Sequence, residues 1–138
     1  MIHERYNEKA YLIADADELK LSNETEVVIY RETRWCDEIA VDLEGQEDRF
    51  EELKPLIVFA AENLCKMDCI AQKYDKEDRF YENYAVAYIC LDIPDRIILT
   101  YYGTDVNTEF NVVFERKGDE LILKSFGTTK DISPDWTW

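Results

Sequence analysis

The sequence has few of the residues on which nucleotide-binding motifs depend. It contains four glycines, at positions 45, 103, 118 and 127, and these lie far apart in the chain. A phosphate-binding loop needs clustered glycines, because backbone N–H groups must approach the phosphate oxygens closely. Neither a P-loop nor a dinucleotide-binding fingerprint is present, and we predict no cofactor.

Histidine is almost absent as well, which removes the usual catalytic base. His3, close to the N-terminus, is the single histidine of the sequence, and no serine lies in a G-x-S-x-G turn. Nucleophilic catalysis needs a base beside a serine or cysteine. We therefore predict no catalytic residue and no enzyme. A carboxylate pair stays open as an alternative, although among 31 acidic residues some pair will always be found.

The cysteines lack the partners that a metal site requires. There are four, Cys36, Cys65, Cys69 and Cys90. Cys65 and Cys69 are four residues apart on a predicted helix, a spacing that allows them to share a metal ion. A zinc site needs two more ligands, and histidine does not supply them. We predict reduced, largely buried thiols and no metal site.

Long apolar runs are missing too. No run approaches the roughly 20 residues that span a bilayer, and residues 1–11 lack the basic and apolar regions of a signal peptide. We expect a cytoplasmic protein that forms one domain over residues 1–138, with residues 1–10 mobile or loosely docked. The tail at 128–138 contains Trp136 and Trp138, which we expect to dock on the domain.

Basic residues are scarce relative to acidic ones. Lys and Arg total 16 against 31 Asp and Glu, which gives a net charge of −15. Such a surface repels phosphate backbones and anionic membranes, so we predict no nucleic-acid or membrane binding. It attracts a basic protein partner, because opposite fields speed encounter and help to select the partner. The alternative is that the charge serves only solubility.

The clearest positive signal is an amphipathic helix. Apolar residues recur at alternating steps of three and four from Phe50 to Tyr74. Residues 56–61, LIVFAA, are apolar on every side, which predicts burial. Asp48 and Glu51 have the spacing of an N-cap and its capping-box partner. Pro55 predicts a kink or restart of the helix at Lys54-Pro55.

Segments rich in β-branched and aromatic residues lie on both sides of this helix. The predicted strands are 27–35 and 39–43 before the helix, and 84–91, 97–102, 108–114 and 121–126 after it. A short apolar run at 11–14 is a further candidate. The connections are short, so sequence neighbours should pair antiparallel. We predict an α+β fold, in which an N-terminal hairpin and a C-terminal meander form a curled antiparallel sheet of about six strands packed on one long helix.

Acidic clusters flank the predicted helix and the predicted hairpin turn. The residues that we predict to bind a partner are Asp37, Glu38, Glu47, Asp48, Glu51 and Glu52. Trp35 and Tyr102 are candidate aromatic anchors within acidic surroundings, since interfaces favour such side chains. Trp35 also fits a core position on a strand face.

The order of these elements resembles that of small bacterial families encoded beside polymorphic or contact-dependent toxins. The resemblance runs from Thr25 to Gly127 and is carried by VIYRETRWCDEIAVDLEG, FEELKPLIVFAAENLCKMDCIAQKYD and DRIILTYYGTDVNTEFNVVFERKGDELILKSFG. The stretch nearest to a motif is YYGTDVNTEFNVVF, residues 101–114. Many such proteins are immunity proteins, which bind their cognate toxins through variable surfaces. The resemblance therefore implies a partner but transfers no site residue.

Charge and resemblance together predict a non-catalytic immunity protein that covers the active site of a cognate toxin. A nuclease toxin with a basic cleft would suit an acidic inhibitor. The alternatives are a nucleic-acid mimic that binds several basic proteins, a small enzyme with a carboxylate site, and a housekeeping domain. The oligomeric state, the strand order and the surface that binds are left open by the sequence.

Overall fold

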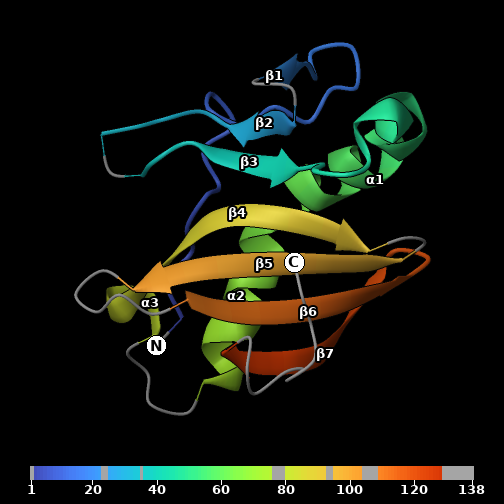
Figure 1. Ribbon diagram of the computed structural model, residues 1–138. Coiled ribbons are helices and arrows are strands. Elements are labelled where there is room, and N and C mark those ends of the chain that lie inside the picture. The colour runs from blue at the N-terminus through green and yellow to red at the C-terminus, as the bar shows by residue number, and fades with distance from the viewer. Residues whose placement is uncertain are drawn as a thin grey trace.

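The computed structural model describes residues 2–22, 25–34, 36–75, 80–92, 95–103 and 109–128. These residues form an α+β fold in which a seven-stranded, mostly antiparallel sheet packs on two helices (Figure 1). The predicted fold class is confirmed, whereas the predicted six strands and single long helix are not. Trp35, which fits a core position or an aromatic anchor, lies outside the described residues, as do Trp136 and Trp138, which we expected to dock on the domain.

The strands follow one another across the sheet in the order of the sequence. They are β1 (Leu21–Ser22), β2 (Glu26–Tyr30), β3 (Ile39–Asp42), β4 (Tyr84–Asp92), β5 (Arg96–Gly103), β6 (Glu109–Lys117) and β7 (Glu120–Thr128). All neighbours pair antiparallel except β3 and β4, which are parallel. Parallel neighbours need a long crossover, and here the helical segment supplies it.

The N-terminal part of the sheet differs most from the prediction. β1 is the additional strand, and two residues are too few to show a periodic pattern. β2 ends at Tyr30 rather than continuing to residue 35. Residues 11–14 contribute a bridge between Leu12 and Tyr30 instead of a strand.

The helical crossover is divided at Asn63. It contains a 3-10 turn, η1 (Glu47–Arg49), followed by α1 (Phe50–Glu62), α2 (Leu64–Tyr74) and the short α3 (Phe80–Asn83). The Asn63 side-chain Nδ2 donates to the Phe59 carbonyl at 2.9 Å, and the Asn63 backbone N–H donates to the same carbonyl at 3.1 Å. The break therefore lies eight residues beyond Pro55, where we had placed it.

The start of α1 also corrects two sequence predictions. Pro55 lies inside the helix, and its missing N–H leaves the Glu51 carbonyl without its helical donor. Both residues are exposed, so water can reach that carbonyl. Asp48 belongs to η1 and does not cap α1; Arg49 takes the N-cap position, and its side chain makes no capping hydrogen bond. Glu51 and Glu52 do lie in the first turn, where the helix dipole favours negative charge.

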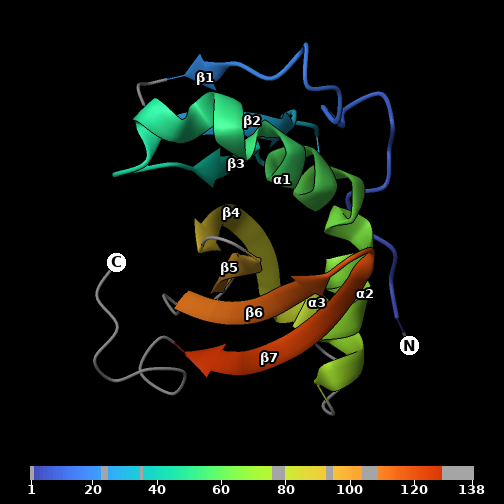
Figure 2. The same ribbon diagram turned by 90° about the vertical axis from the view of Figure 1, so that its right-hand side faces the viewer.

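The helices cover one face of the sheet, and α2 lies against β4–β7 (Figure 2). The helix side chains in this core include Leu56, Ile57, Leu64 and Met67, and the strand side chains include Ile29, Val41, Ile89, Leu99 and Phe114. Full burial of one such side chain contributes about 1.5–3 kcal/mol. Across the described part of the chain, no helix combines the length and apolarity needed to cross a membrane.

Candidate protein-binding surface

The sheet face turned away from the helices carries a groove across β2–β5. The groove has a volume of about 390 Å³ and is lined by Glu26, Glu38, Ala40, Asp42, Ala87, Tyr88 and Tyr102. Strand register explains this set, because residues directly opposite each other on neighbouring strands share a face. Glu26 lies opposite Asp42, and Ala40 lies opposite Tyr88. Val27, Val41 and Ile89, which alternate with them, belong to the core.

A β-bulge in β4 turns Tyr88 toward the groove. The register between β4 and β5 shifts between Val86 and Tyr88, so Val86 lies opposite Tyr101 and Tyr88 lies opposite Thr100. In a regular strand Val86 and Tyr88 would point to the same face. Because Ala87 is the extra residue, Val86 enters the core while Tyr88 faces the groove. The sequence gives no local sign of this bulge.

Tyrosine side chains form one wall of the groove. The rings of Tyr88 and Tyr102 meet edge to face with centroids 6.1 Å apart. Tyr102 is 50% exposed, so its ring is available to a ligand. The Tyr88 hydroxyl donates to Glu109 Oε1 at 3.3 Å. Burial, and next the charge of Glu109, raise the pKa of Tyr88 well above its ordinary value, so it stays a protonated donor at neutral pH.

Carboxylates form the opposite side of the groove, and two of them have no partner among the described residues. The side chains of Glu26 and Glu38 make no hydrogen bond or ion pair with the described residues, whereas Asp42 Oδ1 accepts the Glu44 N–H at 3.0 Å. Among the described residues, no lysine or arginine lines the groove. Unpaired carboxylates beside an aromatic wall favour a cation in this position.

The residues that we predicted to bind a partner do not form one surface. Asp37 and Glu38 precede β3, whereas Glu47, Asp48, Glu51 and Glu52 follow it (Figure 1). Glu38 lines the groove, and Asp37 lines a different cleft beside the N-terminal segment. The structure adds Glu26, Asp42 and Tyr88, which the sequence analysis did not select. Their strands pair only in the folded sheet, so no sequence motif marks them.

Three of the four acids around the start of α1 have partners within the chain. Glu47 Oε1 accepts the Gly45 N–H at 3.1 Å. Lys54 Nζ lies 3.0 Å from Glu51 Oε1, and Arg49 forms a forked contact with Glu52 at 2.9 and 3.1 Å. The hydrogen bond from Arg49 lowers the pKa of Glu52. These local cations reduce the negative field that this cluster presents to a partner.

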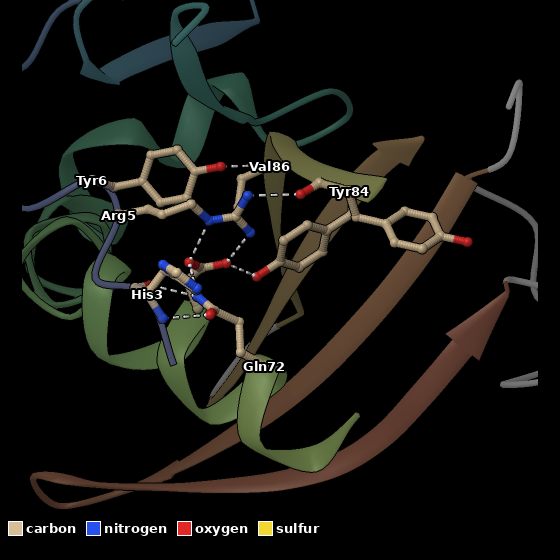
Figure 3. Close-up of polar contacts among 8 residues, drawn as sticks. His3, Arg5, Tyr6, Gln72, Tyr84 and Val86 are labelled. Atoms are coloured by element: carbon tan, nitrogen blue, oxygen red, sulfur yellow. Dashed lines mark hydrogen bonds and ion pairs between the residues drawn. The ribbon is translucent and has the colours of Figure 1, made fainter. Parts of the chain in front are cut away.

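A second cleft, of about 570 Å³, lies beside the N-terminal segment, and Arg5 and Tyr6 contribute to its lining. Behind it Arg5 makes a forked ion pair with Asp68, with Nε to Oδ2 at 2.9 Å and Nη2 to Oδ1 at 2.8 Å (Figure 3). Arg5 Nη1 also donates to the Tyr84 carbonyl at 2.8 Å. The Tyr101 hydroxyl donates to Asp68 Oδ1 at 2.7 Å, so both charged groups are engaged internally.

Further hydrogen bonds hold the N-terminal segment against α2 and β4. The His3 N–H donates to Gln72 Oε1 at 2.8 Å, and Gln72 Nε2 donates to the His3 carbonyl at 2.7 Å (Figure 3). The Val86 N–H donates to the Tyr6 hydroxyl oxygen at 3.0 Å. We expected residues 1–10 to be mobile or loosely docked and did not anticipate these contacts. Asp68 and Gln72, two polar residues four apart beside the apolar face of α2, were the available signal.

The buried polar groups of this cleft are poorly suited to acid–base or nucleophilic chemistry. Burial raises the pKa of Tyr6 to about 12 and raises that of Tyr101 well above its ordinary value, so neither phenol is a base at neutral pH. Burial raises the pKa of the Cys36 thiol to about 11, and Cys36 Sγ donates to the Asp37 carbonyl. A thiol with a raised pKa is a weak nucleophile.

The four cysteines are free thiols, and each is partly buried. Within the described ranges, no group of three or more His, Cys, Asp or Glu side chains is placed to hold a metal ion. No protein-family model, curated protein or solved structure matches the chain. The features that bear on function are therefore the groove and the charge of the molecule.

Proposed function

We propose that the protein is a non-catalytic module that binds a basic protein, and that it acts as an immunity protein by covering the active site of a cognate toxin. The observation that carries this proposal is the tyrosine-walled acidic groove on a chain with a net charge of −15. A cleft that has evolved to bind phosphate presents the complementary positive field. An acidic module in such a cleft would exclude the nucleic-acid substrate.

The state of the titratable groups supports a non-catalytic role. Arg5 and Asp68 neutralise each other, and the hydroxyls of Tyr6 and Tyr101 keep their protons at neutral pH. By contrast, the carboxylates of Glu26 and Glu38 have no hydrogen-bond or ion-pair partner in the described part of the chain. A recognition surface is expected to keep charges available to a partner, whereas buried charges are neutralised inside the protein.

The test is calorimetry with the protein encoded by the adjacent upstream gene, at low and moderate salt. We expect one-to-one binding that weakens as salt rises, because salt screens the attraction between exposed charges. Co-expression should abolish the toxicity of that partner. Absence of binding at both salt concentrations would contradict the proposal.

A panel of unrelated basic proteins separates a cognate inhibitor from a general nucleic-acid mimic. Selective binding requires that the two surfaces match in shape and in the positions of their contacts, as well as in charge. We therefore expect the panel to bind at least about a hundredfold more weakly than the cognate partner, a difference of about 2.7 kcal/mol. Equal affinity for the panel and the partner would contradict the immunity proposal.

A further inference from the structure

We propose that the groove across β2–β5 binds an arginine side chain presented by an extended, exposed segment of the partner. The inference rests on the proposed function, since it names the chemical group of the partner that the acidic module recognises. The groove residues that carry it are Glu38, just before β3, Asp42 at the end of β3, and Tyr102 in β5.

The chemistry of the two walls selects a guanidinium. Tyr102 offers a half-exposed ring, and Arg stacks on aromatic rings through its planar, weakly hydrated head group. Glu38 offers carboxylate oxygens from the opposite side, and guanidinium forms forked, charge-assisted hydrogen bonds with a carboxylate. Asp42 lies four residues further along the chain, at the end of β3 and roughly 13 Å away in an extended segment, so it adds negative charge to the groove and not a second contact to the same head group. A lysine ammonium would gain the Coulomb attraction without planar stacking or forked bonding.

The size of the groove fits a side chain rather than a folded surface. Its volume of about 390 Å³ lies near the lower end of the roughly 300–1,000 Å³ typical of small-ligand sites. Ala40 and Ala87 supply only methyl groups to its lining, so larger neighbours on either side leave a depression between them. An extended segment delivers one long side chain into such a depression while its backbone stays outside.

The groove is a better arginine site than the acidic cluster around the start of α1. There Arg49 and Lys54 already occupy the carboxylates of Glu52 and Glu51. In the groove, Glu38 has no cationic partner among the described residues. A cation from the partner therefore gains a full charge pair in the groove, whereas at α1 it must compete with a local one.

The probe is a blocked pentapeptide with one central arginine between glycine and serine residues, titrated into the full-length, isotope-labelled protein by NMR. Matched peptides carry lysine or citrulline at the centre. We expect the arginine peptide to shift the backbone amides of residues 40, 42, 88 and 102. The lysine peptide should bind about threefold more weakly, and citrulline, which keeps the plane but not the charge, should leave these amides unmoved.

Two charge-matched variants locate the site. Glu38→Gln with Asp42→Asn removes two negative charges from the groove, and Glu51→Gln with Glu52→Gln removes two from α1. We expect the double substitution in the groove to weaken arginine-peptide binding about tenfold. The double substitution at α1 should change that binding less than about twofold. Amide spectra of the core strands check that both variants are folded. Equal weakening by the two pairs, or equal binding of arginine and lysine peptides, would overturn the inference.

The failures of the inference and of the proposed function are separable. If the adjacent-gene product binds the double variant Glu38→Gln with Asp42→Asn as tightly as it binds the unaltered protein, the arginine site is wrong and the proposed function stands. If the arginine peptide binds the groove but no basic partner is found, the site stands and the proposed function is wrong. Tyr102→Ala adds an independent measurement, because it should weaken arginine binding without changing the net charge of the protein.

Discussion

At the scale of single residues, Asp68 is the centre of the contacts that hold the N-terminal segment. Its side chain is fully buried, and it accepts hydrogen bonds from Arg5, Gln72 and Tyr101. A buried carboxylate is tolerated only where charge and hydrogen bonds replace its hydration. Because Arg5 is 63 residues away in the sequence, this one interaction connects the start of the chain to the middle of the fold.

Removal of Arg5 should therefore be costly. In Arg5→Ala the Asp68 carboxylate loses its counter-charge but keeps the hydrogen bonds from Tyr101 and Gln72. We expect the free energy of unfolding to fall by roughly 2–4 kcal/mol, measured by urea denaturation. Arg31→Ala, which removes an exposed hydrogen bond to the Ala10 carbonyl, is the matched control and should cost less than about 1 kcal/mol. Equal losses in the two variants would argue against a buried ion pair.

The buried phenols predict a loss of stability in alkali. Tyr6 has its pKa raised by burial from 10.0 to about 12, so the unfolded state releases this proton first as pH rises. The contribution of Tyr6 to stability is complete below pH 10 and is lost as pH rises toward 12. We expect it to fall by roughly 1 kcal/mol between pH 8 and pH 11, as measured by urea denaturation at each pH.

Tyr6→Phe is the control for this alkaline loss. The variant lacks the titrating hydroxyl, so its stability should fall less steeply above pH 10, although it also loses the hydrogen bond from the Val86 N–H. An identical fall in both proteins would mean that Tyr6 does not titrate with a raised pKa.

At the scale of secondary-structure elements, much of the fold could be predicted from the sequence. The long strands β4–β7 and the helical segment carry strong periodic patterns, and the antiparallel pairing of β4–β7 follows from their short connections. The division at Asn63 could not be predicted, because the apolar pattern continues across it without a proline or glycine. The parallel pairing of β3 with β4 depends on where the crossover docks, which no local pattern records.

The candidate site was predicted less well, because its residues come together only when distant strands pair in the fold. Glu38 could be selected as part of an acidic cluster, but charge density alone does not separate it from Glu51 and Glu52. What distinguishes them is whether a cation lies nearby in the fold. Tyr88 faces the groove because of a bulge, and its partner across the sheet, Ala40, lies 48 residues earlier in the sequence.

The position of Pro55 gives a prediction for α1. Pro55→Ala restores an N–H that can donate to the Glu51 carbonyl and removes the clash of the ring with the preceding turn. We expect the free energy of unfolding to rise by about 1–3 kcal/mol, partly offset by the greater freedom of the unfolded chain. Urea denaturation measures the change. An unaltered or lower stability would indicate that the first turn of α1 is already adapted to the proline.

At the scale of the whole molecule, the internal charges are neutralised while a net charge of −15 remains on the protein. The position of the charges matters more than their sum, because Arg49 and Lys54 cancel part of the negative field at α1, whereas no described lysine or arginine lines the groove. Under the proposed function, a basic partner would be steered first by the total charge and then positioned by the carboxylates of the groove. We therefore propose that total charge governs the encounter and that the groove governs the orientation of the complex.

The most direct test is the association rate with the adjacent-gene product, measured by stopped flow over a range of salt concentrations. The account predicts fast association that slows steeply with salt, and a slower, less salt-dependent rate for Glu38→Gln with Asp42→Asn than for Glu51→Gln with Glu52→Gln. Both variants lose two negative charges, so a difference between them reports position and not net charge. An association rate that is independent of salt, or that is equal in the two variants, would contradict recognition through the acidic groove.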